Sequence, residues 1–147
     1  MVGTIHLEKR IKAPVARVYS AFGQTKSLRG WYDPLCDLDK ATPGGKLIGD
    51  NYPSAEILAV ISNHIIVHRY RDLVSGLGIW SFVEKSGGKS TLLVFDQLDA
   101  YDRRDERDSI TFYWTGPIEN LAAFCEGREL PFDHDAGDYK EGLKRRV

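Results

Sequence analysis

The sequence predicts an α+β fold in which a curved antiparallel sheet of about six strands wraps around one long C-terminal helix. Three observations lead to it: a strand-like segment begins the chain, short alternating segments separated by turn residues fill the middle, and a long amphipathic stripe lies near the end. The chain has 147 residues, of which 42% are hydrophobic, enough for one domain with a buried core.

In the first segment, residues 4–12, apolar and polar residues alternate, which is typical of a strand with one solvent-exposed face. Ile5, Leu7 and Ile11 share the apolar face. Lys9 interrupts that face, so we expect this strand to lie near an edge of the sheet or a cavity mouth.

Two short helices are expected after the first strand. Pro14 begins the first one, where its missing N–H costs nothing, and Gly23 ends it. Residues 25–32 read as the second helix, with Leu28, Trp31 and Tyr32 on one side.

Five further segments have the residue types of strands: residues 46–49, 54–61, 64–71, 77–85 and 90–98. The gaps between neighbouring segments from 54–61 onward are short enough for hairpins, so the sheet is predicted to be an antiparallel meander. Gly87-Gly88 is the clearest hairpin turn. The first strand is expected to pair with the last one and to help the sheet curl.

The long helix is predicted from an apolar stripe at helical spacing, formed by Ile110, Trp114, Ile118, Leu121 and Cys125. Asp108 or Ser109 is the expected cap, and Gly127 marks the end. Pro117 removes one backbone hydrogen bond, which predicts a kink or a late helix start.

Composition excludes several classes of protein. A formal net charge of −1 argues against a nucleic-acid binder, and no apolar run is long enough to span a membrane. Cys36 and Cys125 match neither a disulfide framework nor a zinc pattern, so we expect reduced thiols in a cytoplasmic protein without metal or cofactor. Residues 1–131 should form the domain, and residues 132–147 a mobile tail.

Several motifs follow one another in a familiar order: Ala13-Pro14-Val15-Ala16-Arg17-Val18-Tyr19, Trp31 with Pro34, Pro43-Gly44-Gly45, Gly87-Gly88 before Thr91, and Trp114, Ile118, Leu121, Cys125 and Glu126. With them the chain resembles the START-like, Bet v 1-type (SRPBCC) helix-grip superfamily over about residues 5–130. Within it, the nearest resemblance is to small bacterial proteins named for the C-terminal domain of the activator of Hsp90 ATPase. The superfamily includes carriers, cyclases, hydratases and co-chaperones, so the resemblance is weak for function.

The chain departs from the family's pattern at three places. Tyr113 stands before Trp114 where the family commonly has Gly, and the segment between Gly45 and Ala55 is shorter than usual. Gln97 occupies a position near which the family's last strand often ends in a His. If that His is a general base in some relatives, its absence weakens a catalytic interpretation.

A helix across a curled sheet often leaves a pocket, and six aromatic residues are candidates for its wall: Trp31, Tyr70, Trp80, Phe82, Phe95 and Trp114. Gln97 and Ile118 complete the candidate ligand contacts. Plain core packing is the alternative for each residue. Alternation leaves open which face of 77–85 points inward, because Trp80/Phe82 and Ile79/Val83 are both apolar.

His68 is the candidate for acid–base chemistry, because its pKa lies near neutrality and it shares strand parity with Tyr70. A hydrogen-bonded or partly exposed strand histidine is the alternative. His64 is four residues away, about 13 Å along a strand, which is too far to share a metal ion. Two interpretations are open for the charged residues of the strands: they are either polar anchors inside a pocket or outward charges on a solvated face of the sheet. These residues are Glu56, Arg69, Arg71 and Asp96.

The expected pocket and the family resemblance together imply three alternative functions. The first is a protein that binds a small hydrophobic or amphipathic ligand in an internal cavity. The second is an enzyme of the cyclase, aromatase or hydratase type, acting without a metal on a small apolar substrate. The third is an interaction domain that resembles the Hsp90 activator and has a chaperone as its partner. A homodimer is possible in each case.

Overall fold

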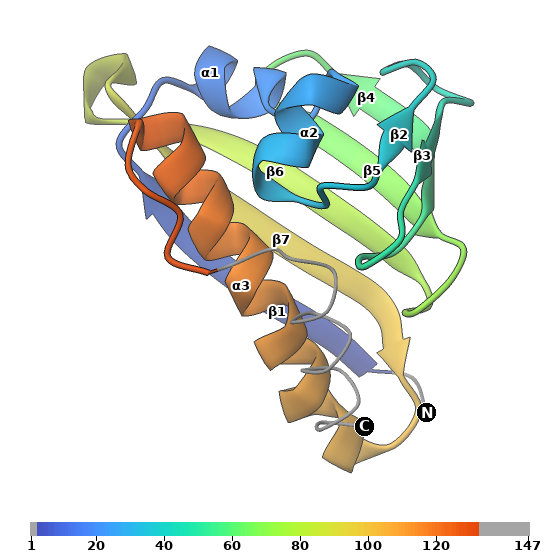
Figure 1. Cartoon of the computed structure of the whole chain (residues 1–147). Helices are drawn as coiled ribbons and strands as arrows, with labels where there is room; N and C mark the ends of the chain where they lie inside the picture. Colours follow the sequence, from blue (N-terminus) through green and yellow to red (C-terminus); the bar gives the residue numbers. More distant parts are fainter. Residues whose placement is uncertain (1–2, 133–147) are drawn as a thin grey trace.

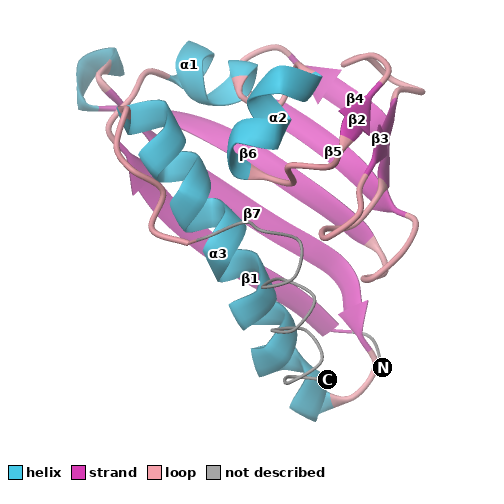
Figure 2. Cartoon of the chain, viewed as in Figure 1, coloured by secondary structure: helices cyan, strands magenta, loops and turns pink. Residues whose placement is uncertain are grey.

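The computed structural model describes residues 3–132. Its seven strands form one sheet in the order β1-β7-β6-β5-β4-β3-β2 (Figure 1). The strands are β1 (Gly3–Ile11), β2 (Asp37–Leu38), β3 (Lys46–Ile48), β4 (Ala55–Ile61), β5 (Ile65–Tyr70), β6 (Leu77–Lys85) and β7 (Ser90–Tyr101). The helices are α1 (Val15–Ser20), α2 (Thr25–Trp31) and α3 (Arg107–Glu126), with single 3₁₀ turns η1 (Ser86–Gly88) and η2 (Arg104–Glu106). Figure 2 shows the three α-helices on the same face of the sheet.

The predicted fold class is confirmed, with one more strand than expected. All neighbouring strands are antiparallel, and β1 pairs with β7 as predicted. The additional strand is β2, which pairs with β3. A strand of two residues has no alternation, and the sequence pattern therefore gave no sign of it.

The long helix extends further than its apolar stripe. It runs as one element through Pro117, so the late start proposed as an alternative is wrong. Neither Asp108 nor Ser109 is the cap, because both lie inside the helix. Gly127 ends the helix as predicted, and its φ of 72° is the left-handed conformation that glycine adopts without steric cost.

The core lies between the sheet and the helices. Trp80 and Phe82 face it, while Val83 is exposed on the other side of β6, which decides the inward face that alternation left open. Cys36 and Cys125 are free thiols buried in the same core.

The predicted tail lies almost wholly outside the described residues, which end at Phe132. No helix between residues 3 and 132 has the length and hydropathy needed to cross a membrane. Over the same span, no three His, Cys, Asp or Glu side chains gather closely enough to hold a metal ion.

Candidate functional site

The six aromatic residues proposed as a ligand wall come together in one cluster between the sheet and the helices. Trp31, Trp80, Phe95 and Trp114 are each at most 1% exposed. The Phe95 ring lies 4.1 Å from that of Trp80 and 4.8 Å from that of Trp114, centroid to centroid. The space they surround is therefore largely filled by their own rings, and Ile118 of α3 packs in the same cluster.

A row of polar side chains crosses this apolar cluster on the inner face of the sheet. His68 of β5 is paired with Gly78 of β6, and Gly78 is paired with Gln97 of β7. A side chain at position 78 would overlap the hydroxyl of Tyr70, so the phenol lies over the glycine. The glycine thus makes room for a polar group in the middle of the core.

Gln97 uses both ends of its buried amide. Its oxygen accepts a hydrogen bond from the Trp114 indole N–H over 2.7 Å. Its nitrogen donates to the carbonyl oxygen of Ser75 over 2.8 Å. Gln97 therefore fixes the long helix and the β5–β6 loop to the same point of the sheet.

His68 and Tyr70 are inward-facing, with exposures of 7% and 6%. Burial lowers the pKa of His68 to about 4, so its imidazole is neutral at pH 7. The indole N–H of Trp80 donates to Nδ1 of His68 over 3.3 Å, which places the imidazole proton on Nε2. Burial raises the pKa of Tyr70, an effect that the nearby indole N–H of Trp80 partly offsets.

A cavity of about 30 Å³ lies beside His68, under α1 and the loop that follows it. It has room for a water molecule but not for an organic ligand. Its wall is formed by Tyr19, Phe22, Gly23, Ala41, Ile57, Val60, Ile66 and His68.

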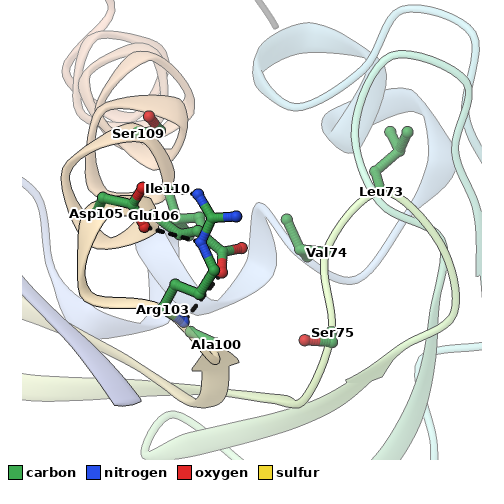
Figure 3. Close-up of a pocket in the computed structure, with 9 residues that line it drawn as sticks. All are labelled: Leu73, Val74, Ser75, Ala100, Arg103, Asp105, Glu106, Ser109 and Ile110. Atoms are coloured by element: carbon green, nitrogen blue, oxygen red, sulfur yellow. Dashed lines mark hydrogen bonds and ion pairs between the residues drawn. The ribbon is translucent and has the colours of Figure 1, made fainter. Parts of the chain in front are cut away.

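A larger space is open to solvent at the other end of the row, where β7 leads into α3. This cleft has a volume of about 570 Å³, within the range of small-molecule sites. Figure 3 shows the residues that line it: Leu73, Val74, Ser75, Ala100, Arg103, Asp105, Glu106, Ser109 and Ile110. The β5–β6 loop forms one wall and the beginning of α3 the other. None of these residues was among the predicted ligand contacts.

The cleft is amphipathic. Leu73 and Val74 stand on the loop side, whereas Arg103 extends from the helix side and donates to Asp105 over 2.7 Å. Val74 and Ile110 are half-buried and also pack against the core cluster, so the inner end of the cleft borders the core. The sequence signal for this site is weak, because the charge-dense run 99–108 has the composition of either a solvated connection or a helix entry.

The charged residues proposed as polar anchors, Glu56, Arg69, Arg71 and Asp96, lie on the outer face of the sheet. Arg71 pairs there with Glu56, and Asp96 pairs with His6. Arg69 is exposed. Because Ala55, Ile57, Phe95 and Gln97 alternate with these residues and face inward, outward charges on a wet face are the correct interpretation.

No protein-family model and no curated protein matches the chain. Solved structures do. The Aha1 dimer from Colwellia psychrerythraea is 14% identical, with a TM-score of 0.71, over 84% of this chain and 96% of that one. CalU16 from Micromonospora echinospora is 18% identical, with a TM-score of 0.70, over 97% and 83%. DynU16, from the dynemicin biosynthetic locus, is 20% identical, with a TM-score of 0.69, over 88% of this chain and 50% of that one. The chain therefore has the same helix-grip fold as these proteins, with a curved antiparallel sheet against a long C-terminal helix.

Proposed function

We propose that this protein binds a small amphipathic molecule whose apolar body lies in the cleft between the β5–β6 loop and α3. The observation that carries the proposal is the cleft itself, about 570 Å³ in volume, with the apolar Leu73 and Val74 on the loop wall and both charged side chains and the apolar Ile110 on the helix wall. A ligand with one apolar and one polar edge satisfies both walls.

The position of the cleft adds to this argument. Val74 and Ile110 are half-buried, line the cleft and also pack against the core cluster that contains the aromatic rings. A flat apolar ligand that displaces the side chains of Val74 and Ile110 would lose contact with these two residues and gain contact with aromatic rings of the core. The predicted wall residues, Trp114 and Tyr70 foremost, would then contact the inner end of the ligand.

Calorimetric titration with 2-acetylnaphthalene tests the proposal, because this probe is flat, small and amphipathic. Ser109→Trp places a large ring in the cleft, and we expect it to weaken binding at least tenfold. Thr111→Trp is the matched control, since Thr111 is a hydroxyl residue two positions along α3 that does not line the cleft. Equal affinity of both variants for the probe would contradict the proposed site.

An enzyme of the cyclase or hydratase type is the second candidate. The observation that favours it is that His68 and Tyr70 both face inward, with ring centroids 6.2 Å apart. A neutral imidazole and a phenol are a possible base and acid. Turnover of a bound polyketide-like substrate that is lost in both His68→Gln and Tyr70→Phe would support this candidate, and turnover unaffected by either change would exclude these roles.

An assembly role comes from the comparison with the Aha1 dimer. Among residues 3–132, β1 is the outermost strand at one edge of the sheet; it is nine residues long, and a second copy can add its own strand there. Sedimentation equilibrium measures the dimer directly. Addition of the protein to an Hsp90-type chaperone, followed by measurement of the ATPase rate, decides whether a chaperone is a partner; an unchanged rate excludes it.

A further inference from the structure

Tyr70 carries a buried hydroxyl without a hydrogen-bond partner in the described part of the chain, since the nearby indole N–H of Trp80 donates to His68. The Tyr70 side chain is 6% exposed, and its Oη forms no hydrogen bond among residues 3–132. The neighbouring polar groups, by contrast, have hydrogen-bond partners. The amide of Gln97 is bonded at both ends, and Nδ1 of His68 accepts a hydrogen bond from Trp80. Buried polar groups are nearly always paired, so an unpaired one calls for an explanation.

The space for this hydroxyl is made by the backbone. Gly78 lies directly under the Tyr70 hydroxyl, and any side chain there would overlap it. Gly78 is also the strand partner of both His68 and Gln97, so the phenol oxygen lies in the polar row between them.

Tyr70 is also next to the cleft in the chain. It is the last residue of β5, and its N–H donates to the carbonyl of Gly76, which follows the loop residues of the cleft wall. Val74, in that loop, lines the cleft and packs against the core cluster. The cleft wall thus follows Tyr70 directly in the chain, and the proposal requires that a bound ligand displace Val74 to reach the phenol.

We infer that the Tyr70 hydroxyl donates a hydrogen bond to an uncharged oxygen, of the carbonyl type, at the inner end of the ligand. This inference rests on the proposed function and specifies the chemical class of the ligand. The partner is an acceptor because a phenol donates readily and because the two indole N–H groups of the row are already engaged.

The oxygen is uncharged because the row holds no charge that would balance a carboxylate. Gln97, Trp80 and Trp114 are neutral, and burial keeps His68 neutral at pH 7 by lowering its pKa to about 4. A carboxylate taken into such a site would be desolvated without a cationic partner, which is strongly unfavourable. Ketones, esters and amides with a flat apolar body fit the site.

The experiment compares two probes of the same shape, 2-acetylnaphthalene and 2-isopropylnaphthalene, which differ in one carbonyl oxygen. We expect the wild-type protein to bind the ketone about fivefold more tightly than the hydrocarbon, as one neutral hydrogen bond provides. Tyr70→Phe should remove this preference while its affinity for the hydrocarbon stays unchanged. Its unfolding temperature should equal or exceed that of the wild type, since an unpaired buried hydroxyl is lost.

Tyr32→Phe is the matched control. Tyr32 is a buried tyrosine whose hydroxyl donates to the carbonyl of Pro53 over 2.7 Å, so this change should lower the unfolding temperature and keep the preference for the ketone. Equal affinity of the wild type for both probes, or a preference that survives in Tyr70→Phe, overturns the inference and leaves the proposed function standing. Failure of both probes to bind overturns both.

Discussion

Trp114 on the long helix and Gln97 on the last strand are joined by a fully buried hydrogen bond of 2.7 Å. The same glutamine holds Ser75 of the cleft wall. The helix, the sheet and the cleft are thus connected through a single side chain, and this connection leads to the first prediction.

Gln97→Leu should destabilise the protein by about 2–5 kcal/mol, because it leaves a buried indole N–H and a backbone carbonyl without partners. Urea denaturation measures this change. Gln24→Leu is the control: Gln24 is exposed and should alter the free energy of unfolding by less than about 0.5 kcal/mol. A similar small effect at position 97 would show that water replaces the lost bonds.

Gly78→Ala should destabilise the protein by about 1–3 kcal/mol, the usual cost of adding a methyl group to a packed core. The new methyl group would overlap the Tyr70 hydroxyl. Gly23→Ala serves as the comparison, because the nearest atom to its methyl group would be the Ser20 carbonyl oxygen at 3.6 Å. Equal thermal stability of the two variants would mean that Tyr70 moves without cost.

Acid should destabilise the protein through His68. Burial lowers its pKa in the folded state to about 4, whereas the unfolded chain titrates near 6.5, so the unfolded state binds more protons between these values. Stability is therefore lost as the pH falls through this window. From pH 7 to pH 5 this group alone should remove about 2 kcal/mol.

The measurement for His68 is urea denaturation at both pH values. His68→Gln should reduce the loss by that amount, whereas His64→Gln, at an exposed position, should retain it. His6 acts in the opposite direction, because hydrogen bonds with Glu8 and Asp96 raise its pKa. An unchanged loss in His68→Gln would show that the imidazole is already protonated in the folded protein at pH 5.

Both thiols should be inert in the folded protein. Burial raises the pKa of Cys36 to about 12 and that of Cys125 to about 11, so the reactive thiolate is rare at pH 8. A disulfide reagent such as Ellman's should react with both thiols in urea and with neither within minutes in native buffer. Fast reaction of one thiol before unfolding would show that its part of the core opens readily.

Periodicity in the sequence was sufficient for the element order. The alternation of residues 4–12 predicted β1, and the stripe from Ile110 to Cys125 predicted most of α3, because burial on one face leaves a local trace in the chain. The inward face of β6 was not predictable in this way. Trp80 and Ile79 are equally apolar, and only packing against the helices chose between them.

The candidate site depends on register and on contacts distant in sequence. The overlap of Tyr70 with Gly78 requires the pairing of β5 with β6, and no local pattern specifies it. The cleft brings Leu73 and Val74 next to a segment about 30 residues later in the chain, where a run of charged residues is compatible with a solvated connection or a helix entry and gives no sign of a site. The alternation of the strand was enough to place His68 and Tyr70 on the same face, but it could not predict that this face is buried.

The most direct test of the ligand site is a titration of ¹⁵N-labelled protein with 2-acetylnaphthalene, followed by amide chemical shifts. The cleft predicts that shifts concentrate in residues 73–75, at Ala100 and at Ile110, with the Trp114 indole N–H moving as the inner end is reached. Shifts confined to the opposite end of the sheet around η1, or none at millimolar probe, would contradict a small-molecule site in this cleft.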